Sequence, residues 1–308
     1  MRKSANRRNF YTIRTVSEGQ RKTSNMIKIF FDSRQSVSEN DSFSPSAQKP
    51  AQVAESWRNL GIPVEFSSYI PSTIKQIKLV HKDAYVDGVF KGTHVNGFGN
   101  KSNQVAAALP WVCGSMVAAA LYAFENKINT FSPTSGAHHA GYERGGGFCT
   151  FNFLMLAAVL VHQAGAQRVG IVDCDMHFGD GTENIIRKIG IDYVQHSSFA
   201  RSDFSGTDDG QNFIDHFPDE LQKFSNCDII LYNAGADPHI NDPLGGVLTT
   251  DQLRSRDFLL FLCMKKLGIP VATSLAGGYQ RDENGSINPV LEIHDNTLRE
   301  CHRVLTEY

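Results

Sequence analysis

Short apolar runs alternate with longer amphipathic stretches along most of this chain. Each short run is bounded by turn-forming residues and contains β-branched side chains, which is typical of a strand in a buried sheet. These runs occupy residues 27–31, 128–132, 168–175, 228–235 and 270–278. Apolar residues at helical spacing predict helices over residues 102–126, 151–166 and 250–268. The alternation indicates an α/β fold in which a parallel sheet carries helices on both faces.

The chain is long enough to bury a large core, and its sequence shows no internal repeat, low-complexity block or linker. It has 308 residues, of which 41% are hydrophobic and 20% charged, and we expect a single domain over residues 26–308. Residues 1–25 differ, because seven Lys or Arg residues stand there against one acid, Glu18. We expect a disordered or mis-started N-terminal extension. An organelle-targeting presequence, which is also Arg-rich and acid-poor, is the alternative.

The charge and the cysteines narrow the class of protein. A formal net charge of −2, with no long basic run after the N-terminal segment, argues against direct binding of nucleic acid or a membrane surface. The six cysteines form no Cys-x-x-Cys pair, which argues against a zinc ribbon or a disulfide scaffold and favours a reducing, cytoplasmic location. We also expect no apolar stretch near the ~20 residues that a bilayer requires.

Polar residues gather where three of the predicted strands end. The sequence VDCDMHFGDG ends one apolar run, NAGADPH a second and LAGGYQ a third. From these segments we select four acids, a histidine and a tyrosine: Asp173, Asp175, His177, Asp180, Asp237 and Tyr279. Ligands of open parallel sheets bind outside the carboxyl ends of the strands, so we expect these side chains to meet at one edge.

Three of these residues form a candidate metal site. Asp175 and His177 lie two residues apart, so on extended backbone their side chains face the same way, and Asp237 from another strand completes the set. Two carboxylates and one imidazole with an open position suit a catalytic Zn²⁺, with Fe²⁺ as the alternative; a structural zinc would recruit cysteines. An isolated Asp-x-His is more often a solvated loop, but the neighbouring acids and histidines favour a metal site.

The segment PTSGAHHAGYERGGG places His138 and His139 side by side in a glycine-rich stretch. A lone histidine is usually a packed side chain, but a hydrolytic metal site needs a base that takes a proton from water. Asp173 and Asp180 are two spare carboxylates available to orient the two imidazoles. Tyr279 offers a hydroxyl for the oxyanion of a tetrahedral intermediate. Together these groups indicate acyl transfer to water.

Four motifs in this order resemble the signatures of the histone deacetylase superfamily, which has the arginase/deacetylase fold. They are GAHHAGYERGGGFCTFN, VDCDMHFGDGT, YNAGADPHINDPLGG and LAGGYQ, and they span about residues 135–280. The YNAGAD sequence and the glycine triplet are most similar to the class IV branch and its bacterial relatives. The resemblance implies a zinc-dependent hydrolase of linear amide bonds, whose partner is an acyl-lysine peptide or protein, or an acylated small amine.

The resemblance also implies a role for each matching residue. The metal ligands are Asp175, His177 and Asp237. The catalytic groups are Tyr279 and two histidine–aspartate pairs, His138 with Asp173 and His139 with Asp180, with His139 as the general base. The acyl-lysine tunnel is lined by Gly147 and Phe148, with Phe204 on the opposite wall. A structural K⁺ lies near Asp173, the Asp175 backbone and His177.

Three features depart from the family pattern. PTSGA replaces the familiar Arg-Pro-Pro-Gly before the histidine pair, so the arginine at the base of the tunnel is missing. Asp180 stands where class II and class IV members usually carry Asn, and its full negative charge should raise the pKa of His139. The segment NGFGNKS offers no counterpart of the rim aspartate that holds the substrate backbone in some members.

Other functions make different demands on the sequence. An acylpolyamine hydrolase uses the same site and differs at the tunnel mouth, where this chain has no long insertion near Asn96. A dimanganese enzyme of the arginase type needs further Asp and His ligands, and GAHHAG with the tyrosine of AGGYQ argues against it. A catalytically silent acyl-lysine binder would be expected to have lost a ligand, whereas all three are present. The acyl-chain preference and the oligomeric state stay open.

Overall fold

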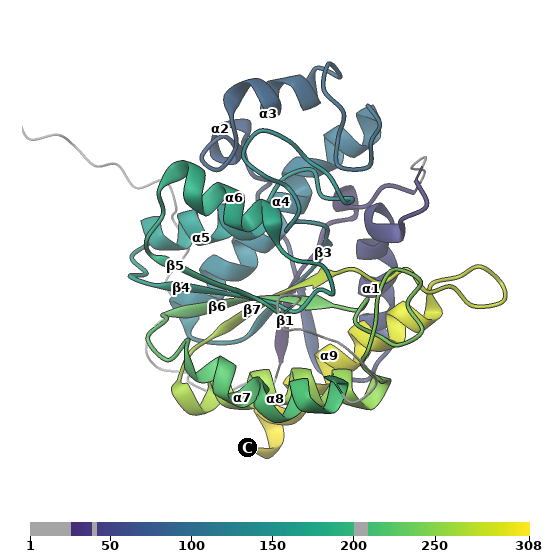
Figure 1. The fold of residues 1–308 in the computed structure, drawn as a ribbon, viewed down its shortest axis with the longest axis vertical. Helices are drawn as coiled ribbons and strands as arrows, with labels where there is room; N and C mark the ends of the chain where they lie inside the picture. Colours follow the sequence, from purple (N-terminus) through teal and green to yellow (C-terminus); the bar gives the residue numbers. More distant parts are fainter. Residues whose placement is uncertain (1–25, 39–41, 200–208) are drawn as a thin grey trace, which may run out of the picture.

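The computed structural model describes residues 26–38, 42–199 and 209–308, which build a seven-stranded parallel sheet with helices on both faces (Figure 1). The strands are β1 (Ile27–Phe30), β2 (Val64–Ser67), β3 (Thr130–Ser135), β4 (Val169–Asp173), β5 (Val194–Ser198), β6 (Ile229–Gly235) and β7 (Val271–Ala276). Their order is β2-β1-β3-β7-β6-β4-β5, and all neighbours run parallel. This confirms the predicted α/β fold; the predicted N-terminal extension, residues 1–25, lies outside the described residues.

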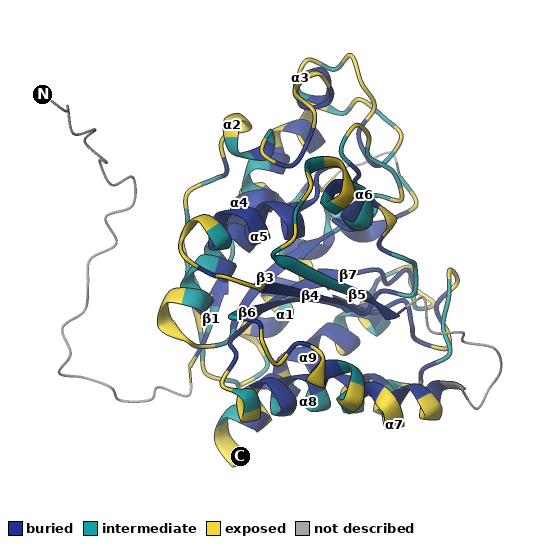
Figure 2. Ribbon diagram, turned by 60° about the vertical axis from the view of Figure 1, so that its left-hand side comes forward, coloured by how far each residue is buried: buried dark blue, intermediate teal, exposed yellow. Residues whose placement is uncertain are grey.

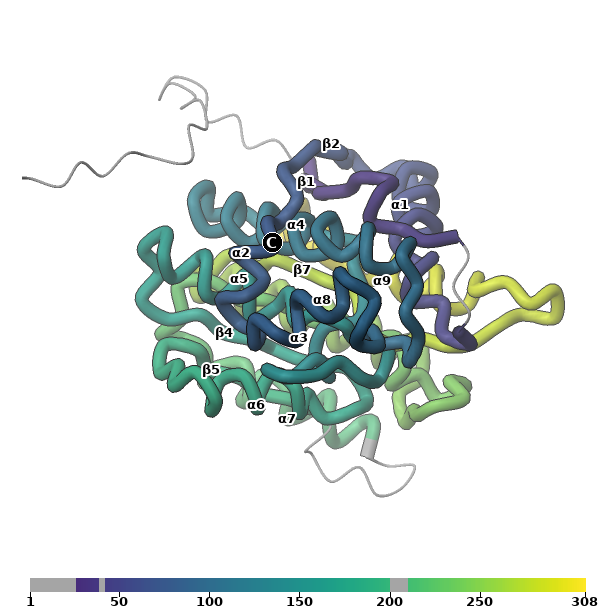
Figure 3. Tube along the Cα trace, turned by 90° about the horizontal axis from the view of Figure 1, so that it is seen from above, coloured from purple at the N-terminus to yellow at the C-terminus, as the bar shows by residue number. Residues whose placement is uncertain are grey.

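The five predicted strands are all present, and two more complete the sheet. β2 and β5 are its two edges, which lie on opposite sides when the molecule is seen from above (Figure 3). β4, β6 and β7 are buried along their whole length, and this explains their largely apolar sequences without a polar-apolar alternation. The edge strands consist mostly of half-buried residues without such a run, so the apolar pattern did not reveal them.

Helices cover the sheet in two layers. The helices are α1 (Lys49–Arg58), α2 (Ile74–Ile77), α3 (Asp83–Phe90), α4 (Asn103–Asn126), α5 (Phe153–Gln163), α6 (Asp180–Ile189), α7 (Asp209–Gln222), α8 (Thr250–Leu267) and α9 (Asn288–Glu307). Figure 2 shows α4, α5 and α6 on one face and α7, α8 and α9 on the other. Alternate residues of β6 contribute to the two cores: Ile229 and Leu231 to one, Ile230 and Tyr232 to the other.

Helix α4 corrects the expectation that the chain has no apolar stretch of membrane-spanning length. The helix has 24 residues, and an 18-residue window within it has a mean hydropathy of 1.7. However, 56% of that window is buried inside the molecule, where α4 packs on α5 and on the sheet. Its apolar composition therefore follows from its place in the core of this layer.

Candidate active site

The carboxyl ends of β4 and β6 bring three potential metal ligands together. Asp175 and His177 lie just beyond β4, and Asp237 lies just beyond β6. His177 Nδ1 is 3.1 Å from Asp175 Oδ1 and 2.9 Å from Asp237 Oδ2. One donor atom from each of the three lies within 4.8 Å of the other two. We refer to Asp175, His177 and Asp237 as the ligand cluster.

The electrostatics of the ligand cluster fit a bound cation. Asp237 is fully buried, and its burial together with the charge of Asp175 raises the pKa of Asp237 to about 7. Hydrogen bonds with the two carboxylates raise the pKa of His177 to about 10. Two buried carboxylates repel each other and lack water, so the cluster favours a positive charge between them. Two oxygens and one nitrogen form a donor set that Zn²⁺ accepts in catalytic sites.

Both histidines of the loop after β3 pair with an aspartate through Nδ1. His138 Nδ1 lies 2.8 Å from Asp173 Oδ2, and both side chains are buried. His139 Nδ1 lies 2.6 Å from Asp180 Oδ1 on the more exposed side of the site. His138 Nε2 is 3.6 Å from Asp175 Oδ1, so this imidazole borders the ligand cluster. The structure thus forms the two pairs that the family resemblance implies.

The two histidines differ in charge because their surroundings differ. Burial opposes protonation of His138, but the carboxylates of Asp173 and Asp175 outweigh it and raise the pKa of His138 to about 9. Burial and the positive charge of His138 lower the pKa of His139, while the hydrogen bond with Asp180 acts in the opposite direction. These opposite shifts favour the charged form of His138 and the neutral form of His139 at neutral pH. Only the neutral imidazole can accept a proton.

The glycine triplet lets the His139 ring lie against the backbone. A Cβ atom on Gly147 would lie 2.4 Å from His139 Cδ2, and the φ angle of Gly147, +51°, also favours glycine. Phe148, the next residue, has a φ angle of +63°, which is uncommon for a side chain of this size. This conformation brings the Phe148 ring centroid within 5.6 Å of that of Tyr279, so the strained backbone lies at the site itself.

A two-glycine turn after β7 places Tyr279 next to the ligand cluster. Residues 277–278 have φ angles of +45° and +89°. A Cβ atom on Gly277 would lie 2.2 Å from the carboxyl carbon of Asp237, so only glycine permits this approach. The backbone N–H of Tyr279 donates to Asp242 Oδ2 at 2.8 Å, and this bond fixes the turn from its other side.

Aromatic rings form a wall on the outer side of Tyr279. Phe43 stacks on Tyr279 with ring centroids 5.7 Å apart and an interplanar angle of 18°. The Phe148 ring lies 6.1 Å from Phe43, and Phe98 lies 6.1 Å from Phe148, both measured between centroids. Phe204, the predicted opposite wall, lies outside the described residues. Sequence reasoning missed Phe43, because it lies far upstream of the motifs in a segment with no distinctive pattern.

Lys49, at the start of α1, is a second residue that sequence reasoning missed. It is fully buried, and its Nζ donates to the carbonyl oxygen of Gly277. Burial lowers the pKa of Lys49 to about 8, against the attraction of Asp237 and Asp175. The site therefore has a basic group next to the turn at Gly277, although the Arg-Pro-Pro-Gly motif before the histidine pair is absent. In the sequence, Lys49 is an ordinary lysine before Pro50 and carries no signal of its role.

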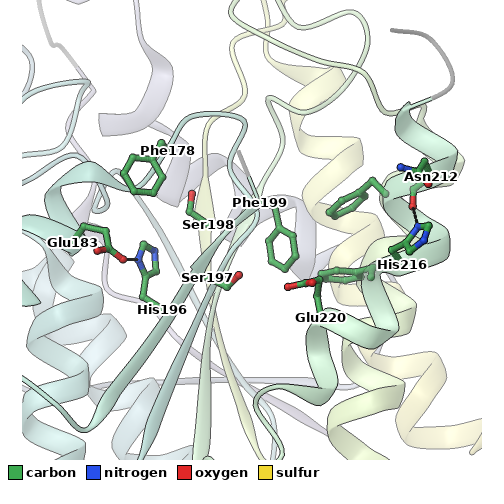
Figure 4. Close-up of a pocket in the computed structure, with 11 residues that line it drawn as sticks. Phe178, Glu183, His196, Ser197, Ser198, Phe199, Asn212, His216 and Glu220 are labelled. Carbon is green, nitrogen blue, oxygen red and sulfur yellow. Dashed lines mark hydrogen bonds and ion pairs between the residues drawn. The ribbon is translucent and has the colours of Figure 1, made fainter. Parts of the chain in front are cut away.

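A separate cavity lies beside β5. His196 Nε2 lies 4.0 Å from Asp173 Oδ2, and its Nδ1 lies 2.9 Å from Glu183 Oε1. A cavity of about 370 Å³ opens beside these side chains and reaches His216 of α7 (Figure 4). Among the described residues, its lining includes no member of the ligand cluster. The cavity therefore adds no group to the metal site.

Comparison with known proteins agrees with this geometry. Residues 46–200 match the histone deacetylase domain family. An uncharacterised protein of Picosynechococcus sp. is 30% identical over 233 residues, which cover 67% of this chain and 76% of that protein. The chain therefore belongs to the histone deacetylase family.

Relatives with assigned names are more distant. Histone deacetylase 15 of Arabidopsis thaliana is 25% identical over 72% of this chain and 46% of its own length. Acetylpolyamine amidohydrolase 2 of Pseudomonas aeruginosa is 27% identical over 50% of this chain and 51% of its own length. The chain thus spans about half the length of these two relatives. The crystal structure of the HDA15 HD domain has a TM-score of 0.71 at 22% identity and 91% coverage of both chains, which confirms the fold.

Proposed function

We propose that this protein is a zinc-dependent amidohydrolase that removes the acyl group from acyl-lysine or a related N-acyl amine. The observation that carries the proposal is that His138, Asp175 and Tyr279 line one small cavity at the carboxyl edge of the sheet. A histidine that can carry a positive charge, a metal-ligating carboxylate and an oxyanion donor around one space, with His139 next to His138, are components of amide hydrolysis. Membership of the histone deacetylase family supports the same class of reaction.

The ligand cluster would hold the zinc ion. The ion, when bound, supplies Lewis-acid chemistry that polarises a carbonyl and acidifies water. The surrounding side chains would transfer the proton and stabilise the oxyanion. The strand ends keep Asp175 and Asp237 buried, so a bound cation would compensate for the water that the two carboxylates have lost.

His139 acts as the general base of this mechanism. Its neutral Nε2 accepts a proton from the attacking water, while Asp180 holds the ring through Nδ1 and stabilises the imidazolium that forms. The same proton then passes from Nε2 to the nitrogen of the departing amine, so His139 ends the cycle neutral. His138 does not transfer this proton; the carboxylate of Asp173 favours its charged form, whose positive charge would stabilise the negative charge that develops on the acyl group.

Tyr279 acts as the oxyanion donor. Burial and the charges of Asp175 and Asp237 raise the pKa of Tyr279, so its hydroxyl keeps its proton and can donate it in a hydrogen bond. The turn that carries Tyr279 is held by Asp242 on one side and by Lys49 on the other. A donor fixed in advance stabilises developing charge without a cost of reorganisation.

The aromatic wall favours a substrate with a methylene chain. Acylation removes the charge of a lysine side chain, so its four methylenes and amide can pack along a wall of rings such as Phe43 and Phe148. An N-acetylpolyamine presents the same chemistry and is the second candidate, favoured by the similarity to acetylpolyamine amidohydrolase 2.

The direct test is an assay of purified protein whose zinc content is known from elemental analysis. We expect zinc-dependent release of free amine from at least one member of a panel of acetyl-lysine peptides, longer acyl-lysine peptides and N-acetylpolyamines. His139→Ala should lose nearly all of this activity, since a general base contributes about 10² to 10⁴ to the rate. Protein that holds one zinc per chain and binds an acyl-lysine peptide without hydrolysing anything would instead be a silent binder.

A further inference from the structure

One buried side chain on α8 contacts the ends of both strands that carry the ligand cluster. Arg256 of α8 is fully buried, and α8 lies on the sheet face opposite α4 and α5 (Figure 2). Its Nη1 donates to the carbonyl oxygen of Gly235 at 2.8 Å and to that of Cys174 at 3.3 Å. Cys174 directly precedes Asp175, and Gly235 lies two residues before Asp237. A single guanidinium group therefore bridges the backbone next to both carboxylate ligands.

Arg256 adds a link between the two strand ends at a point where the β4–β6 pairing has stopped. The β4–β6 register ends at Asp173 and Asn233, before either carboxylate ligand is reached. Beyond the last paired residues the two backbone segments stay very close, since a Cβ atom on Gly235 would lie 2.4 Å from the Cys174 carbonyl oxygen. The separation of the ligand carboxylates thus depends on contacts made outside the sheet ladder.

Arg256 is itself held in one orientation. Its Nε lies 2.9 Å from Asp257 Oδ1, and both side chains are buried. Asp257 also accepts hydrogen bonds from the Tyr232 hydroxyl and, at 2.6 Å, from Thr297 Oγ1. A planar guanidinium whose other edge is fixed loses little freedom when it bonds two carbonyls. The network connects α8, β6 and α9 to the base of the ligand cluster.

We infer that Arg256 is a positioning residue that sets the metal affinity of the site by fixing the ends of β4 and β6. This rests on the proposed function, because it requires that the ligand cluster bind a metal. Arg256 does not touch the ion or the substrate. It acts through the backbone at Cys174 and Gly235, which determines the distance between the carboxylates of Asp175 and Asp237.

The test is the zinc affinity of the full chain, measured by competition with a chromophoric chelator. We expect Arg256→Met to weaken zinc binding at least tenfold. Arg256→Lys keeps the positive charge but replaces the planar guanidinium with a compact ammonium group. We therefore expect a smaller loss of zinc affinity, of at least threefold. The matched control is Arg254→Met on the same helix, which removes an ion pair with buried Glu300 and should leave zinc affinity within twofold of wild type.

Each result separates the alternatives. Folded Arg256→Met and Arg256→Lys proteins that both bind zinc within twofold of wild type would overturn the inference and leave the proposed function standing. Arg254→Met weakening zinc as much as Arg256→Met would overturn it too, because the effect would then belong to the helix as a whole. If Arg256→Met does not fold, the zinc affinity of Arg256→Lys alone tests the inference, and a value within twofold of wild type would overturn it. A wild-type chain that binds no zinc would overturn the proposed function itself.

Discussion

The Nδ1 atom of His139 lies 2.6 Å from Asp180 Oδ1, and this pair faces solvent more than the neighbouring pair of His138 and Asp173. The Asp180 side chain is 57% exposed, whereas that of Asp173 is completely buried. Two chemically identical pairs thus work in different environments. The surroundings of the buried pair favour a charged His138, whereas those of the more exposed pair favour a neutral His139 that can accept a proton.

Asp180→Asn should shift the pH dependence of the enzyme. The substitution withdraws a negative charge from the His139 imidazolium, so the pKa of His139 should fall. His139 must be neutral to act as a base, and activity is therefore lost as pH falls through its pKa. The acidic limb of the kcat/KM profile should move to lower pH, which steady-state kinetics across pH would show.

Asp173→Asn is the matched comparison for this experiment. Its partner is His138, whose pKa is already raised to about 9, so the acidic limb should not shift in the same way. An acidic limb that moves with Asp173→Asn and stays in place with Asp180→Asn would make His138 the base.

Tyr279→Phe should reduce turnover by about 10² to 10³, the loss expected for one oxyanion donor. The turn is held through the backbone N–H of Tyr279, which the substitution leaves in place, so zinc content and fold should not change. Single-substrate kinetics together with elemental analysis of the same sample would check both parts. A rate within about threefold of wild type would remove Tyr279 from the mechanism, because that difference is below ~1 kcal/mol.

Phe43→Ala tests the aromatic wall. Loss of the Phe43 ring removes apolar surface that would cover the methylene chain, and at about 0.8 kcal/mol per buried methylene we expect KM for an acyl-lysine peptide to rise about two- to tenfold. The control is Ile70→Ala, since Ile70 is 79% exposed and lies outside the wall. Equal KM values for wild type and Phe43→Ala would show that the substrate does not use this ring.

The sequence predicts the centre of the sheet better than its edges. Runs such as residues 228–235 are mostly apolar because β6 is buried on both faces, and its position follows directly. β5 has four half-buried residues out of five, so its sequence VQHSS carries no apolar signal. The order of the strands depends on contacts between distant segments and could not be obtained from local patterns.

The candidate site likewise has residues that the sequence could predict and residues that it could not. Residues such as His139 and Asp237 belong to compact motifs, and their roles can be predicted because the motif places them at strand ends. Lys49, Phe43 and Arg256 reach the site from other elements, and each makes its contact only in the folded chain. Of these three residues, Arg256 alone has a weak sequence signal of burial, because it forms a pair of opposite charges with Asp257 directly before the apolar sequence FLLFL.

The central claim is that hydrolysis depends on a metal held by the ligand cluster, and titration of metal-free protein with zinc tests it most directly. For wild type, we predict that activity rises with bound zinc and reaches a plateau at about one zinc per chain, because three ligands and one open position form a single site. Asp237→Ala should neither bind zinc stoichiometrically nor gain activity. Full activity of wild type without metal, or an Asp237→Ala protein that still binds one zinc per chain and turns over substrate, would contradict the account.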